Sequence, residues 1–118
     1  MQKIFYFFFL LPLGINSCDN HVKVEPGKQQ VSDLKIHIFL NDTIKTKTGE
    51  QGYGYDVLKN GTVYIHQPII PAVAGNQGFS SESHAQKTAE FVVYKIAHNI
   101  IPPSVSYEEL DSLGVLDQ

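Results

Sequence analysis

Apolar and polar residues alternate over residues 34–40, which is the pattern of a β-strand with one buried face. The apolar members of this alternation are Leu34, Ile36, Ile38 and Leu40. The polar stretch NDTIKTKTGEQG, residues 41–52, then interrupts the pattern. We therefore expect the strand to end near Leu40 and a loop to follow it.

Two further runs of strand-forming residues, 53–58 and 62–67, flank the dipeptide Asn60-Gly61. An Asn-Gly step between two such runs is the strongest short-range signal of a β-hairpin. The two runs are therefore predicted to pair as antiparallel strands.

Two registers are open to this hairpin. A two-residue loop would pair Leu58 with Val63, whereas a three-residue loop with Gly61 in a left-handed bulge would pair Val57 with Val63. We favour the three-residue loop because it collects an apolar set on one face of the hairpin. That set is Tyr53, Tyr55, Val57, Val63 and Ile65.

The hydrophobic period changes to that of a helix over residues 82–99. The predicted buried stripe consists of Ala85, Ala89, Val92, Val93, Ile96, Ala97 and Ile100. Ser80 or Ser81 is suited to cap the first turn, and the helix must stop before Pro102 and Pro103.

A second, short helix is predicted after the prolines, because Ser106 and Glu109 form a capping box and Gly114 suits the C-terminal stop. The predicted fold class is therefore α+β. A small antiparallel sheet, made of the hairpin and one or two further strands, packs against one long C-terminal helix, and a short terminal helix follows.

The N-terminus carries Lys3 and then a dense apolar run, residues 4–13. A bilayer-spanning helix needs about twenty apolar residues. This run is shorter and contains Pro12, so it predicts a cleaved export signal.

The string INSC, residues 15–18, resembles the lipobox of bacterial lipoproteins: a branched apolar residue, two intervening residues and a cysteine. The resemblance implies that signal peptidase II removes residues 1–17 as a lipoprotein signal peptide. Cys18 then carries a diacylglycerol thioether that anchors the protein in the membrane. Residues 18–33 are polar and are expected to form a flexible tether, and residues 34–118 a single α+β domain.

The charge composition disfavours nucleic acid as a partner. All nine basic residues are lysines, so the planar guanidinium fork that recognises phosphates and guanine edges is missing. Without Lys3, eight lysines face twelve acidic residues, a formal charge of −4 that repels DNA.

The sequence shows no motif for catalysis, a metal or a cofactor. His84 and His98 are fourteen residues apart, roughly 21 Å along a helix, so they cannot share an ion. No GxSxG string is present, and GYGYD, residues 52–56, lacks the third glycine of a dinucleotide loop. We therefore expect no enzyme activity, no catalytic residues, no cofactor and no metal site.

Residues 68–79 form an unusually apolar segment with two prolines. It can complete the core or present a hydrophobic surface, and core completion is the simpler explanation. If it forms a contact surface, the candidate residues for binding a partner protein are Ile69, Ile70, Val73 and Phe79.

An alternative function is the binding of a small molecule or peptide in the cleft between helix and sheet. The candidate polar contacts for such a ligand are Asp56, Tyr64 and His66. An enzyme is a third hypothesis, which would need His37, Asp56 and His66 together in one pocket.

The strings YIHQPIIPA, GFSSESHAQKTA and PPSVSYEELDSLG resemble an uncharacterised family of small Bacteroidota lipoproteins that is classed as a domain of unknown function. The likeness covers roughly residues 34–114 and implies no known activity. Surface-displayed lipoproteins of that phylum often carry an acidic run after the cysteine, which DNHVKVE lacks. We therefore expect a lipid-anchored envelope protein that faces the periplasm and contacts membrane lipid through Cys18 and, in the leading hypothesis, an envelope protein partner.

Overall fold

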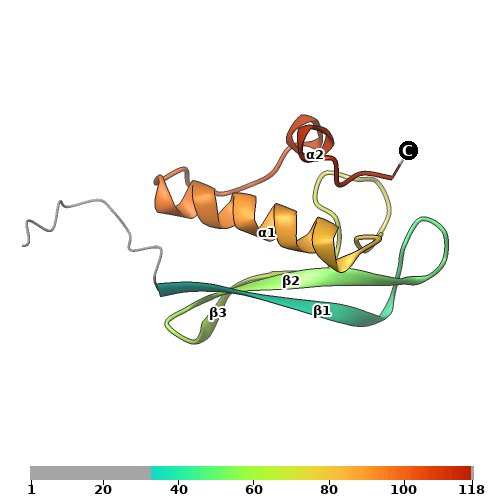
Figure 1. Ribbon diagram of the computed structural model, residues 1–118, viewed down its shortest axis with the longest axis horizontal. Helices are drawn as coiled ribbons and strands as arrows, with labels where there is room; N and C mark the ends of the chain where they lie inside the picture. Colours follow the sequence, from blue (N-terminus) through green and yellow to red (C-terminus); the bar gives the residue numbers. More distant parts are fainter. Residues whose placement is uncertain (1–32, 118) are drawn as a thin grey trace, which may run out of the picture.

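The computed structural model describes residues 33–117. The predicted signal peptide, Cys18 and nearly all of the predicted tether lie outside these residues. The described elements are β1 (Leu34–Lys45), β2 (Gln51–Lys59), β3 (Thr62–Gln67), α1 (Glu82–Ala97) and α2 (Tyr107–Leu113). Figure 1 shows a sheet with α1 lying along one of its faces and α2 beyond α1. This arrangement confirms the predicted α+β fold class.

The three strands form an antiparallel sheet in the order β1-β2-β3. β1 and β2 are longer than the alternation predicted, since the connection between them is only residues 46–50. The predicted end of the strand near Leu40 is thus wrong. Asn41, which is 7% exposed, donates a hydrogen bond from Nδ2 to the carbonyl of Pro68 (2.9 Å), so a polar residue is satisfied within the strand.

The β2–β3 hairpin has the register that we did not favour. Asn60 and Gly61 form a two-residue loop with φ values of 52° and 79°, and Leu58 pairs with Val63. Positive φ at both loop residues matches the right-handed twist of the strands. A register shift after this pair then sets Ile65 opposite Val57, so Ile65 returns to the buried face while Val63 stays 53% exposed.

The core lies between the sheet and α1. Four of the predicted stripe positions on α1 are buried, and they pack with buried tyrosine and valine side chains of β2. These core residues are Ala85, Ala89, Val92, Ile96, Tyr55 and Val57. Ser81 caps the helix by accepting a hydrogen bond from the His84 N–H, and Ile100, beyond the helix end, is 45% exposed.

The short helix α2 begins and ends where the sequence indicated. The Ser106 hydroxyl accepts a hydrogen bond from the Glu109 N–H, and Gly114 adopts a left-handed conformation with φ 71°. Leu110 of α2 is fully buried, so α2 closes the core from beyond α1. Among residues 33–117, no helix combines the length and the apolar character that crossing a membrane requires.

Candidate functional site

A cleft of about 280 Å³ lies between α1, β3, the start of the 68–79 segment and residues 103–105. Its walls come from elements far apart in the sequence and are mainly apolar. They include Tyr55, Ile65, Gln67, Ala72, Val92 and Ser104. None of the residues that line this cleft carries a charge.

Tyr55 is the notable polar residue of this wall. Its side chain is 1% exposed and its ring lies against Phe79, with centroids 6.1 Å apart. Within the described part of the chain its hydroxyl makes no hydrogen bond, and burial raises the pKa of that hydroxyl above its usual range. A buried hydroxyl without a partner costs about 1–3 kcal/mol, so a ligand that pairs with it gains affinity.

Gln67 supplies the second polar group of the cleft. Its Nε2 donates to the carbonyl of Ile69 at 2.7 Å, which fixes the amide at the edge of β3. Its side-chain oxygen has no hydrogen-bond partner among residues 33–117. Tyr55, Gln67 and Ser104 are therefore polar residues set among mainly apolar cleft walls.

The opposite face of the sheet carries a second polar cluster. The Nδ1 atom of His66 lies 2.5 Å from Oδ1 of Asp56, and Nδ1 of His37 lies 3.7 Å from Oδ2 of the same carboxylate. The ring of Phe39 stacks on His66 with centroids 5.3 Å apart. The structure thus brings together the three residues that an enzyme hypothesis requires.

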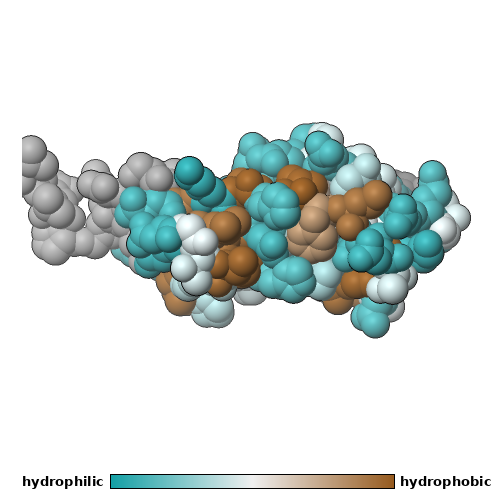
Figure 2. All heavy atoms as spheres, turned by 90° about the horizontal axis from the view of Figure 1, so that it is seen from below, coloured by the Kyte–Doolittle hydropathy of each residue, from teal (hydrophilic) through white to brown (hydrophobic). Residues whose placement is uncertain are grey.

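This cluster lies on an open surface. Asp56 is 14% exposed, whereas the His37 and His66 side chains are more than half exposed. Figure 2 looks at this face, away from α1, and shows hydrophobic and hydrophilic patches intermixed. In residues 33–117, no group of three or more His, Cys, Asp and Glu side chains is placed to hold a metal ion. The contacts of the cluster orient the His66 imidazole between the Asp56 carboxylate and the Phe39 ring.

A protein-family model described as a domain of unknown function, DUF4907, matches residues 45–112. The chain belongs to this family. No curated protein matches the chain. No solved structure matches it either.

The DUF4907 match contains every residue that lines the cleft, as well as the Asp56 and His66 pair. It does not reach Cys18 or the N-terminal residues. The family description carries no activity, so the function of this DUF4907 domain has to be argued from the site.

The four residues predicted to bind a partner protein are mostly used by the fold. Ile70 and Phe79 are 4% and 0% exposed and belong to the core of the DUF4907 domain, and Val73 packs against that core. Ile69 is half-buried. The apolar 68–79 segment thus completes the core, which was the simpler of the two explanations.

The three residues predicted to contact a ligand are not in the helix–sheet cleft. Asp56 and His66 lie on the other face of the sheet, and Tyr64 is 49% exposed at the hairpin, where the Lys59 ammonium lies 5.7 Å from its ring centroid. Sequence reasoning placed a cleft between helix and sheet but missed Gln67 and Ser104. Gln67 and Ser104 lie near each other because of the path that the chain takes after α1. The only sign of that path in the sequence is the pair Pro102 and Pro103.

Proposed function

We propose that this chain is a lipid-anchored protein of the bacterial cell envelope whose DUF4907 domain binds a small molecule or a short peptide segment without catalysing a reaction. The observation that carries the binding role is the cleft lined by Tyr55, a buried residue whose hydroxyl makes no hydrogen bond among residues 33–117. Ligand sites in proteins are typically apolar clefts with a few fixed polar groups, which is the composition found here.

The cleft also limits the ligand. Its volume of about 280 Å³ is at the small end for ligand sites. Because no charged residue lines it, a charged ligand group would lose hydration without gaining a partner. The favoured ligand has a small apolar body and a neutral polar group that accepts from Tyr55 and donates to Gln67, as an amide does.

The proposed anchor is Cys18. The apolar leader and the cysteine at its border support acylation, and placement in the membrane with the domain on the periplasmic side follows from it. The earlier hypothesis of a protein partner at the 68–79 segment is less favoured, because Ile70 and Phe79 are buried.

The binding role can be tested by thermal-shift screening of the purified domain against envelope metabolites and capped dipeptide amides. A ligand should raise the melting temperature by mass action. The variant Tyr55→Phe should weaken its binding about tenfold, and Ser104→Leu should obstruct the cleft. The matched control is Tyr94→Phe, which alters an exposed tyrosine outside the cleft. A ligand that binds both tyrosine variants equally would exclude this site.

The anchor is tested separately by growing cells that express the full chain with labelled fatty acid. The wild type should incorporate the label, and Cys18→Ser should accumulate as an unprocessed precursor without it. Ser17→Ala should still be labelled. Native protein that keeps Met1 and an unmodified thiol would contradict the anchor.

A further inference from the structure

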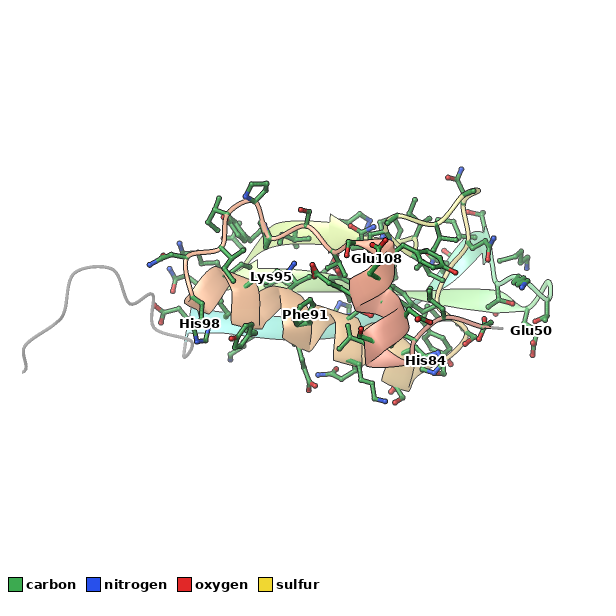
Figure 3. All side chains as sticks on the ribbon, turned by 90° about the horizontal axis from the view of Figure 1, so that it is seen from above. Glu50, His84, Phe91, Lys95, His98 and Glu108 are labelled. Atoms are coloured by element: carbon green, nitrogen blue, oxygen red, sulfur yellow. The ribbon has the colours of Figure 1, made fainter. Side chains whose placement is uncertain are left out.

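Three segments of the domain meet at the end where the described chain begins. The Asn60 N–H donates to the carbonyl of Asp33 at 3.0 Å, so the β2–β3 turn lies beside the start of β1. Figure 1 shows that α1 also ends on this side, and Figure 3 places His98 there. We call this region, formed by Asp33, the turn at Asn60 and residues 98–101, the tether end.

Exposed apolar side chains gather at the tether end. Seven large hydrophobic residues in the described part of the chain are exposed. Tyr94 packs on His98 with ring centroids 4.0 Å apart, and four others belong to residues 98–101 or follow the turn at Asn60. These are Val63 (53%), Tyr64 (49%), Ile100 (45%) and Ile101 (58%).

The two pairs lie on segments that lead to the same cleft. Residues 103–105 and Gln67, at the end of β3, both line it. Ile100 and Ile101 come just before residues 103–105 in the chain, and Val63 and Tyr64 come just before Gln67. Both of these stretches start from the tether end (Figure 1). The exposed apolar side chains therefore lie toward one end of the molecule, with Val63 on the sheet face away from α1 and Ile100 and Ile101 just after α1.

We propose that the tether end lies against the lipid surface, with Ile100, Ile101, Val63 and Tyr64 inserted at the level of the headgroups. This inference rests on the proposed anchor at Cys18. Fourteen residues, 19–32, separate that cysteine from Asp33 and span at most about 50 Å. The proposed anchor is joined to the domain at Asp33, so a bilayer that holds the anchor meets this end at a high effective concentration.

The chemistry of the tether end fits a lipid surface. Branched aliphatic side chains partition into the acyl boundary, and tyrosine prefers the interface because one end of its ring is polar. Lys59 lies against the Tyr64 ring, where its stem can extend toward the headgroups. Because the processed chain has a formal charge of −4, apolar insertion and not headgroup charge should hold this end.

The cysteine content makes a direct experiment available. Cys18 is the only cysteine, so once it is acylated an introduced cysteine is a unique labelling site. Full chains with Ile101→Cys or Thr48→Cys are purified with their lipid, labelled with an environment-sensitive fluorophore and reconstituted in phosphatidylcholine vesicles. Thr48 is exposed in the β1–β2 connection and serves as the matched control.

The probe at position 101 should shift to the blue on reconstitution and be quenched by lipid-borne quenchers, while the probe at position 48 should remain accessible to aqueous iodide. Adding Ile100→Ser to the Ile101→Cys chain should reduce lipid quenching at least threefold, without affecting folding, because Ile100 is exposed. Neither effect should change when the vesicles contain anionic lipid.

The outcomes separate this inference from the proposed function. Fatty-acid incorporation is measured in the same preparation, and its absence overturns both proposals. Incorporation with a probe at position 101 that stays water-exposed overturns the membrane contact alone. Protection of that probe without vesicles would show that a second copy or another protein covers the tether end, which also overturns it.

Discussion

Gly52 of β2 and Gly78 of the 68–79 segment approach so closely that a Cβ atom on Gly52 would lie 2.6 Å from the Cα of Gly78. The residues that follow the two glycines, Tyr53 and Phe79, exchange two backbone hydrogen bonds of 2.9 Å. This contact returns the segment to the sheet and sets the fully buried Phe79 beside Tyr55, so it also shapes the cleft wall.

The close approach predicts a large cost for added volume. Gly52→Ala should lower the free energy of unfolding by about 2–3 kcal/mol, because the new methyl group meets backbone atoms that cannot rotate away. Gly61→Ala is the comparison, since its Cβ would meet nothing within 4 Å and only the positive φ opposes it, at about 1 kcal/mol. Urea denaturation measures both values. Equal costs for the two variants would contradict the packing argument.

Lys95 joins α1 to the C-terminal part of the chain. Its side chain is 10% exposed, and Nζ donates to the Ser104 carbonyl (2.6 Å) and to the Glu109 carboxylate (2.5 Å). Figure 3 shows Lys95 beside α2. Lys95→Met should lower the free energy of unfolding by about 2–3 kcal/mol, because it leaves the Ser104 carbonyl and the Glu109 carboxylate without this donor. The loss is limited because the Glu109 carboxylate is partly exposed.

The control for this ion pair is Lys87→Met, at an exposed position of the same helix. It should change the unfolding free energy by less than about 0.5 kcal/mol. Thermal denaturation of both variants distinguishes a structural ammonium from a general loss of charge. If Lys95→Met is as stable as the wild type, the ion pair between Lys95 and Glu109 makes no net contribution to the free energy of unfolding.

The buried Tyr55 hydroxyl predicts a stability loss at high pH. Burial raises its pKa in the folded state, so the folded protein keeps the proton that the unfolded chain releases near pH 10. The associated stability is fully present below about pH 10 and is lost as the pH rises above that value. Between pH 9 and pH 11, the free energy of unfolding should fall more in the wild type than in Tyr55→Phe. Denaturation at these two pH values measures the difference.

The same variant tests whether the hydroxyl is unpaired in the free domain. At neutral pH, Tyr55→Phe should be as stable as the wild type or more stable, since it removes an unsatisfied polar atom. A loss of more than about 1 kcal/mol would instead reveal a hydrogen bond to the hydroxyl.

The open-face cluster predicts a measurable coupling between Asp56 and His66. A double-mutant cycle with Asp56→Ala and His66→Ala should give about 0.5–1.5 kcal/mol, because Nδ1 and Oδ1 are at hydrogen-bond distance. The matching cycle with His37→Ala should give less, since its separation from the carboxylate is 3.7 Å. Equal coupling energies would mean that charge, and not the hydrogen bond, links these residues.

Local chemistry predicted the helices well. The Ser106 cap and the left-handed Gly114 depend on residues within one or two turns, so the sequence contains the whole cause. The period of α1 likewise predicted four of its buried positions, while Ile100 lies beyond the helix end and is exposed.

Non-local contacts decided what the sequence could not show. β1 continues through Asn41 because that side chain bonds to Pro68, 27 residues away. The two-residue loop pairs Val63 with Leu58 and leaves it off the buried face, and a bulge after this pair, which no propensity marks, returns Ile65 to that face. The cleft residue Ser104 reaches the sheet only through the path of the chain after α1.

The two poles of the domain are therefore available for different uses. The Ser80 hydroxyl donates to the Asp117 carboxylate at 2.9 Å, so the C-terminal residues lie by the first turn of α1, about 24 Å along the helix from His98. A fluorescent protein or affinity tag fused at the C-terminal side of the domain would project from the pole remote from the tether end. Immobilising the domain through such a tag leaves the tether end, which we propose to face the bilayer, unobstructed for measurement.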